Sequence, residues 1–148
     1  MFQGASQLNL DAKGRLAVPT RHREPLSNPG GGRLVLTAHP HGCLLLYPAP
    51  AWEPIRNRIL GFSSTDAGAS LWKRLLIGFA EEFTLDGAGR ILVSPELRNF
   101  AGIEKQVMFV GQGAYFEIWN LGAWTEQLEQ LRSGQAPALP PGMESFSL

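Results

Sequence analysis

The sequence has one cysteine, Cys43, and no apolar run of membrane-spanning length. A single cysteine cannot form an internal disulfide, so nothing in the composition requires an oxidising compartment. A membrane-spanning helix needs roughly 20 consecutive apolar residues, and Lys, Arg, Glu or Gly interrupts every apolar stretch here. The first residues also lack the basic region and apolar stretch of a secretory signal. We therefore expect a soluble, cytoplasmic protein with no membrane partner.

Net charge is absent too, and so are the common catalytic motifs. Thirteen basic residues balance thirteen acidic ones, which argues against a protein that coats any polyanion. The charge is uneven along the chain, because residues 1–78 carry nine basic and four acidic residues and the remainder carries four and nine. The asymmetry leaves room for a local basic surface in the first half, although by itself it favours scattered solvated charges. With no nucleophile elbow, no Gly-x-x-x-x-Gly-Lys loop and no His-Glu-x-x-His motif, we expect neither an enzyme nor a bound cofactor.

An internal repeat organises the 148 residues. Residues 10–18 align with residues 85–93 at an offset of 75, and Trp52 pairs with Trp124 at an offset of 72. The second copy has therefore lost three residues, for which the Pro-Gly-Gly-Gly loop at 29–32 of the first copy is the natural place. Overlooking a duplication would lead to the wrong fold, so we assign the secondary structure of the two copies together.

Each copy is predicted to contain a short strand, a tight turn, a second short strand, a brief helix, a two-stranded hairpin and a longer helix. Apolar and polar residues alternate through residues 7–10, and again in the second copy, as in a half-buried strand. In the turns that follow, Asp11 and Asp86 can accept a backbone hydrogen bond, and Gly14 and Gly89 can adopt the positive φ that reverses the chain.

Capping signals place the helices. Ser94 followed by Pro95 is a typical helix start, and Gly102 is a typical stop, whereas we expect Pro25 to cut short the equivalent helix at residues 19–24. Apolar stripes predict two longer helices, the second of which carries Trp72. The hairpin strands are predicted at residues 34–36 with 44–47 and at residues 107–110 with 116–118.

Neither copy alone has enough strands to close a core, and each leaves edge strands that need cover. We therefore expect the copies to interleave about an approximate two-fold axis. The apolar faces that remain would favour a symmetric oligomer. The four tryptophans are expected in the core or in contacts between subunits, not as a platform for stacking nucleic-acid bases.

Four motifs resemble the MraZ family of bacterial transcriptional regulators. They are Met1-Phe2-x-Gly4-Ala5, Asp11-x-Lys13-Gly14-Arg15-Leu16-x-Val18-Pro19-x-Arg21-x-Arg23, Leu44-Leu45-Leu46-Tyr47-Pro48 before Trp52, and Asp86-x-x-Gly89-Arg90. The resemblance covers residues 1 to about 132. It implies an α+β, β-rich fold of two tandem AbrB-like swapped-hairpin halves, related by pseudo-two-fold symmetry and assembled into a ring. It also implies a cytoplasmic, nucleoid-associated protein that binds short direct repeats in the promoter of its own division and cell-wall operon.

The resemblance suggests a domain organisation. Its parts are a first AbrB-like half at 1–60, a connecting loop and helix at 61–78, a second half at 79–132 and a flexible tail at 133–148. The partners that it implies are double-stranded DNA carrying the direct repeats and further copies of the chain, in an octamer or a dodecamer. Whether binding represses or activates transcription does not follow from the residues.

The first turn supplies the leading candidates for DNA contact. A tight turn between strands projects its tip outward, and Lys13 and Arg15 flank Gly14. Because glycine has no side chain, the backbone of the turn does not protrude between the two basic side chains. Lysine can bring an ammonium to phosphate, and arginine can bind guanine O6 and N7 bidentately. In the second turn Ala88 replaces the lysine, so Arg90 is the weaker candidate.

The remaining candidates for DNA contact could instead have a purely structural or solvated role. Arg21 and Arg23, on the helix after the first turn, could extend the surface toward phosphates or could simply be solvated. Asp11 and Asp86 are expected to be structural residues of their turns. Each of them could also pair with the arginine of its own motif, which would leave that arginine structural as well.

A zinc site is one alternative function. His39, His41 and Cys43 lie within five residues and could hold zinc with a water in the fourth position, as in a hydrolase. They fall between two strand patterns, however, with Pro and Gly as turn residues, and their side chains need not converge. We therefore favour a plain hairpin turn and no metal.

A protein-interaction module is the second alternative. AbrB-like folds also serve in antitoxins that cap a partner protein, and in such proteins a disordered tail usually wraps the partner. Residues 136–148 offer few anchors for this purpose. They are Leu139, Met143, Phe146 and Leu148. Co-purification of a stoichiometric partner would favour this alternative over DNA binding.

Overall fold

The computed structural model describes residues 1–135 and 137–148, and its elements follow the predicted repeat. The first copy contains β1 (Ala5–Asn9), β2 (Arg15–Ala17), α1 (Thr20–Ser27), the short 3-10 helix η1 (Pro29–Gly32), β3 (Leu34–Ala38), β4 (Leu44–Pro48) and α2 (Ala49–Leu60). After α3 (Ala67–Leu76), the second copy contains β5 (Glu81–Phe83), β6 (Arg90–Leu92), α4 (Pro95–Ala101), β7 (Gln106–Gly111), β8 (Phe116–Asn120) and α5 (Leu121–Arg132). Apart from η1 and α3, each element has its counterpart at the offsets of 75 and 72 found in the sequence.

The two copies interleave in one antiparallel sheet of order β1-β7-β8-β4-β3-β5. The first strand of each copy pairs with the hairpin of the other copy, β1 with β7 and β5 with β3. The two hairpins meet where β4 pairs with β8, and the equivalent strands β2 and β6 pair with each other in a small second sheet. These exchanged pairings confirm the expected interleaving about an approximate two-fold axis.

The main core lies between the inner face of the large sheet, the β2–β6 sheet and the helices α1 and α4. Leu16 and Ile91, at the centre of the β2–β6 sheet, point into it and are fully buried. Phe109 and Phe116 stack there with ring centroids 4.2 Å apart. His22 of α1 meets Phe116 edge-on, which buries an imidazole among aromatic rings.

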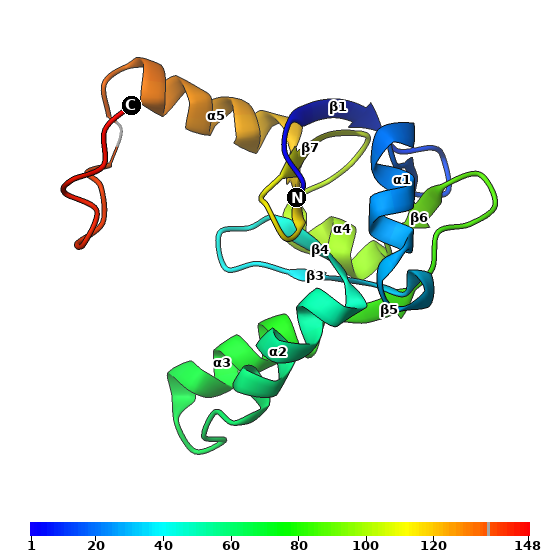
Figure 1. Cartoon of the computed structure of the whole chain (residues 1–148), viewed down its shortest axis with the longest axis horizontal. Coiled ribbons are helices and arrows are strands. Elements are labelled where there is room, and N and C mark those ends of the chain that lie inside the picture. The colour runs from blue at the N-terminus through cyan, green and yellow to red at the C-terminus, as the bar shows by residue number, and fades with distance from the viewer. Residues whose placement is uncertain (136) are drawn as a thin grey trace.

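Helices cover the other face of the large sheet in two places. Helices α2 and α3 pack over Val35, Leu45 and Tyr47, while α5 packs near Val110 and Trp119. Figure 1 shows the α2–α3 pair and α5 extending away from the sheet in different directions, with the β3–β4 turn between them. Among the described residues, no helix is long and apolar enough to cross a membrane.

One expectation about a helix is wrong. Helix α1 continues through Pro25 to Ser27, and the Asn28 amide still donates to the Glu24 carbonyl at 2.9 Å. The completely buried Leu26 explains this, because its packing offsets the one amide donor that proline removes. In α3 the side chain of Trp72 is 48% exposed, so of the two places expected for the tryptophans only a contact between subunits remains for this one.

Candidate nucleic-acid interface

The turn between β1 and β2 is built around the carboxylate of Asp11. Its Oδ1 accepts hydrogen bonds from the backbone amides of Lys13 and Arg15, both at 2.9 Å. Its Oδ2 accepts a hydrogen bond from Arg15 Nε at 2.7 Å. Gly14 takes a φ of 83° and donates its amide to the Asp11 carbonyl at 3.0 Å. One side chain therefore holds both the turn and its arginine.

The turn between β5 and β6 has the same geometry. Asp86 Oδ1 accepts from the amides of Ala88 and Arg90 at 2.9 Å, and Oδ2 accepts from Arg90 Nε at 2.8 Å. Gly89 takes a φ of 72°. The missing lysine thus changes the charge of the second turn and leaves its shape unchanged.

Hydrogen bonding lowers the pKa of both carboxyl groups. The backbone amide of Arg15 is the main cause at Asp11, where the pKa falls to about 2. The backbone amide of Arg90 has the same effect on the pKa of Asp86. Hydrogen bonds donated to a carboxylate favour its charged form. Both aspartates therefore remain ionised at neutral pH and hold their arginines.

Pairing of β2 with β6 brings the two turns together. Arg15 lies opposite Leu92, and Ala17 lies opposite Arg90. Since Leu16 and its partner point into the core, alternation along the strands puts both arginines on the outward face. Arg90 Nη1 also lies 3.9 Å from Asp11 Oδ2, which links the turns electrostatically. The two turns project on the same side of the molecule, beyond α1 (Figure 1).

The arginines keep part of their donors for a ligand. Their side chains are 32% and 33% exposed, and each aspartate occupies the Nε edge of its guanidinium. Lys13 is exposed and forms no ion pair within the described part of the chain. Glu81 and Glu82 line the same shallow pocket as Arg15 and Arg90. An anion is therefore favoured at the tip of the turns rather than beside β5.

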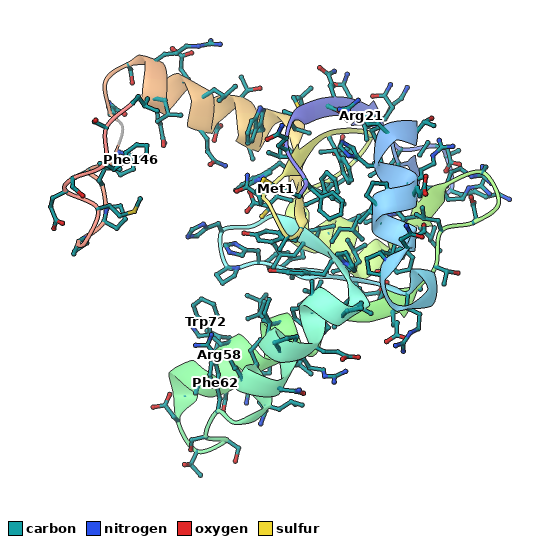
Figure 2. The ribbon with its side chains drawn as sticks, viewed as in Figure 1. Met1, Arg21, Arg58, Phe62, Trp72 and Phe146 are labelled. Carbon is teal, nitrogen blue, oxygen red and sulfur yellow. The ribbon has the colours of Figure 1, made fainter. Side chains whose placement is uncertain are left out.

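The candidates on α1 lie in two different places. Arg23 packs against Gly89, in the turn of the other copy, and its Nε donates to the Val18 carbonyl at 2.8 Å. Arg21 is exposed and donates from Nη2 to Ser6 Oγ at 2.9 Å on β1 (Figure 2). Arg23 therefore supports a turn, whereas Arg21 lies on the opposite side of its helix.

Arg98 is a residue of this site that the sequence reasoning missed. It occupies on α4 the place that Arg23 has on α1, and it packs against Gly14. Its Nε is buried and has no hydrogen-bond partner among the described residues. The available signal was the repeat itself, because Arg23 and Arg98 align at the offset of 75.

The β3–β4 turn brings together only part of the alternative zinc set. The turn is a tight hairpin, in which the His39 amide donates to the Cys43 carbonyl at 2.9 Å. The His39 and Cys43 side chains converge, whereas His41 is exposed and lies outside their group. Glu117, from β8, completes the group and had no signal in the sequence.

Comparison with known proteins identifies the family. The family model described as "MraZ protein, putative antitoxin-like" matches residues 1–75 and again residues 76–138. "Transcriptional regulator MraZ" of Methylobacillus flagellatus is 61% identical over 148 residues, which is 100% of both chains. The proteins of the same name from Aromatoleum aromaticum and Dechloromonas aromatica are 56% and 55% identical, also over 100% of both chains. This is a non-enzymatic family, so the zinc-dependent hydrolase considered from the sequence is wrong. The chain belongs to the MraZ family of transcriptional regulators and carries the family's domain twice in tandem.

Proposed function

We propose that this regulator binds short direct repeats in promoter DNA, in the promoter of its own division and cell-wall operon, through the paired turns. The observation that carries the proposal is the pairing of β2 with β6, which places Arg15 and Arg90 on one exposed face. Each guanidinium is held at Nε by an aspartate. An arginine fixed in this way loses little side-chain freedom when its remaining donors bind guanine O6 and N7.

The two turns contribute unequally to this contact. Lys13 stands exposed at the tip of the first turn, where its ammonium can approach a phosphate. Ala88 occupies the equivalent position of the second turn and offers no charge. The first turn is therefore the principal contact in our proposal. Arg21, on the opposite side of α1 next to β1, supplies a further phosphate contact away from the turns, and Arg23 acts by supporting the second turn.

A single chain would bind too weakly to select a promoter. One good bidentate contact gives only about 1–3 kcal/mol of base discrimination. In a ring, an octamer or a dodecamer, identical turns face successive repeats at a fixed spacing, so later contacts form at high effective concentration. Neighbouring subunits of a cyclic assembly suit direct repeats, whereas an isolated two-fold dimer suits a palindrome.

An exposed apolar surface on α2 and α3 supports self-assembly. Leu71 is 63% exposed and directly precedes Trp72 in α3, whose side chain is 48% exposed, and Phe62 after α2 is 39% exposed. Phe62, Trp72 and Arg58 line one shallow pocket at the far end of the α2–α3 pair (Figure 2). Contiguous apolar surface of this kind marks interaction sites. In our proposal it is the contact with the next chain of the ring.

A footprint on DNA upstream of the protein's own gene tests the proposal, with the oligomer mass measured on the same sample. We expect regularly spaced protected blocks that coincide with direct repeats, produced by a multimer in the cytoplasm and on the nucleoid. A monomer that protects no repeated block would contradict the proposal.

The antitoxin-like alternative keeps one supporting observation. Its candidate anchors in the tail, Leu139, Met143, Phe146 and Leu148, are all exposed. Isolation of the full chain from its native cell decides between the two functions. A stoichiometric protein partner, together with loss of DNA binding in the complex, would favour the alternative.

A further inference from the structure

A cluster of three potential metal ligands lies on the outer face of the large sheet, away from the turns. One ligand atom from each of His39, Cys43 and Glu117 lies within 4.8 Å of the others. We propose that these side chains form a binding site for a tetrahedral divalent cation, with zinc as the best match. A thiolate, an imidazole and a carboxylate are ligands that zinc takes, and the sulfur disfavours magnesium and calcium.

Backbone pairing preorganises the site. The His39 amide donates to the Cys43 carbonyl at 2.9 Å, so these residues close the β3–β4 hairpin. Glu117 on β8 lies opposite Leu45 on β4. Cys43 is two residues from Leu45, and strand alternation therefore puts Cys43 and Glu117 on the same face of the sheet. The ligands thus come from three adjacent backbone segments that are already in register.

The distance between the sulfur of Cys43 and a carboxylate oxygen of Glu117 agrees with coordination. Cys43 Sγ lies 3.6 Å from Glu117 Oε2. Zinc bonds of about 2.3 Å to sulfur and about 2.0 Å to oxygen, at the tetrahedral angle, separate the two ligand atoms by about 3.5 Å. The sulfur is fully buried, whereas His39 and Glu117 are half-buried. The solvent-accessible side of the site is therefore the side of His39 and Glu117.

Neighbouring groups orient the ligands. Trp119 Nε1 donates to Glu117 Oε1 at 3.2 Å, which leaves Oε2 directed toward the thiol. The His41 amide donates to His39 Nδ1 at 3.0 Å. An ion bound through Nδ1 replaces this amide, which lies in an exposed turn and can hydrogen-bond to solvent instead. Outer partners of this kind fix ligand orientation in metal sites.

The charges balance when the ion binds. Binding breaks the S–H bond of Cys43 and releases its proton to solvent, and the resulting thiolate bonds to the cation. The thiolate and the Glu117 carboxylate together neutralise the two positive charges, while the imidazole of His39 stays neutral. A neutral assembly avoids the penalty of leaving an unpaired charge in a half-buried position. Solvent water fills the fourth position.

The site joins the two copies and occurs once in the repeat. His39 and Cys43 belong to the first copy and Glu117 to the second, so the ion would bridge β4 and β8 where the copies meet. The positions related to the three ligands by the offset of 72 are Gly111, Tyr115 and Leu45. That set cannot replace the cluster as a zinc site. The β3–β4 turn also lies on the far side of the molecule from the DNA-contacting turns (Figure 1).

Titration of the metal-stripped full chain with zinc, and separately with cobalt, tests the site. We expect one ion per chain, release of one proton, a thiolate-to-cobalt charge-transfer band and a higher unfolding temperature with metal. Cys43→Ser, His39→Asn and Glu117→Gln should each weaken binding by more than the roughly 10- to 100-fold that loss of an outer partner costs. His41→Asn and Glu82→Gln are the matched controls and should bind as the parent does.

Three results would overturn the site. They are the absence of the cobalt band in the unsubstituted chain, parental metal affinity in Cys43→Ser, and loss of metal binding in His41→Asn. The cobalt spectrum needs no variant, so misfolding of a substituted chain does not affect it. Circular dichroism of each variant accompanies the titrations. DNA binding by Cys43→Ser should be unchanged, which separates this site from the proposed DNA contact.

Discussion

The guanidinium of Arg98, on the second copy, lies directly against Gly14 at the tip of the first copy's turn. A Cβ at Gly14 would lie 2.9 Å from Arg98 Cζ. Arg23 and Gly89 repeat this contact with the copies exchanged. Each of the two turns is therefore packed against an arginine from a helix of the other copy.

Gly14→Ala should destabilise the protein by about 1–2 kcal/mol, because a positive φ is unfavourable for alanine and because the added Cβ displaces Arg98. The control is Gly87→Ala in the second turn, where the φ is not positive and nothing lies within 4 Å of an added Cβ. That variant should unfold within about 0.5 kcal/mol of the parent. Urea unfolding measures both, and equal midpoints for the two variants would show that the turn tolerates a side chain.

Arg15→Ala should weaken binding to the repeat-containing promoter by roughly 5- to 150-fold, the equivalent of about 1–3 kcal/mol for one bidentate contact. Lys13→Ala should weaken binding to all DNA and reduce its salt dependence, because it removes a phosphate contact. Arg90→Ala should have the smaller effect of the two arginine variants. Gel-shift titrations over a range of salt concentrations measure these changes.

Arg132→Ala is the control for the arginine series, since Arg132 is exposed on α5 and pairs only with Glu129 in the described structure. It should bind DNA as the parent does. If Arg15→Ala keeps parental affinity and oligomer mass, the paired turns are not the DNA contact.

Asp11 should titrate at about pH 2 rather than at the usual 3.8, because backbone amides hold its charged form. The folded-state pKa is lowered, so the stabilisation is complete above about pH 3.8 and is lost as the pH falls toward 2. Carboxyl NMR shifts measure the titration directly. Asp11→Asn should flatten the stability profile in this acid range, and a carboxyl that titrates at its ordinary value would contradict the hydrogen-bond network.

His22 should make the fold less stable in mild acid. Burial among aromatic rings, followed by the charge of Arg21, lowers the pKa of its imidazole from 6.5. The unfolded chain therefore binds a proton more readily, and stability falls as the pH drops below about 6.5. Thermal unfolding of the parent and of His22→Gln over this range measures the effect. The difference between the two profiles isolates His22, and parallel profiles would exclude it.

Leu71→Glu should break the proposed ring, because it places a charge in the proposed contact between chains. We expect a smaller oligomer and a loss of promoter affinity that reaches the roughly 100- to 10,000-fold range of avidity effects. Leu139→Glu is the matched control, since that leucine is also exposed but lies in the tail. Light scattering after size exclusion measures the mass, and an unchanged mass for Leu71→Glu would place the contact elsewhere.

The sequence predicted the order of elements because the repeat and the capping residues are local signals. Ser94 accepts from the Leu97 amide and Gly102 ends α4 with a φ of 62°, both as expected. The continuation of α1 through Pro25 was not predictable, since it depends on where Leu26 is buried. Burial depends on packing between segments, which a local pattern does not contain.

The aspartates and arginines of the turns were found because each motif folds on itself. Arg98 could have been inferred from its alignment with Arg23, whereas Glu117 was missed because its position depends on how one copy pairs with the other. That register follows from the whole set of strand pairings and cannot be obtained from spacing along the chain.

The exchange of β1 and β5 makes one chain equivalent to a pair of identical half-length polypeptides wound together. When the two halves are fused in one chain, their sequences no longer have to be identical, so the halves can diverge. Two pairs of equivalent positions show that divergence: Lys13 corresponds to Ala88, and Cys43 corresponds to Tyr115. A symmetrical pair would bind both directions of a DNA duplex alike, whereas unequal halves have a polarity, which the head-to-tail boxes of our proposal would require.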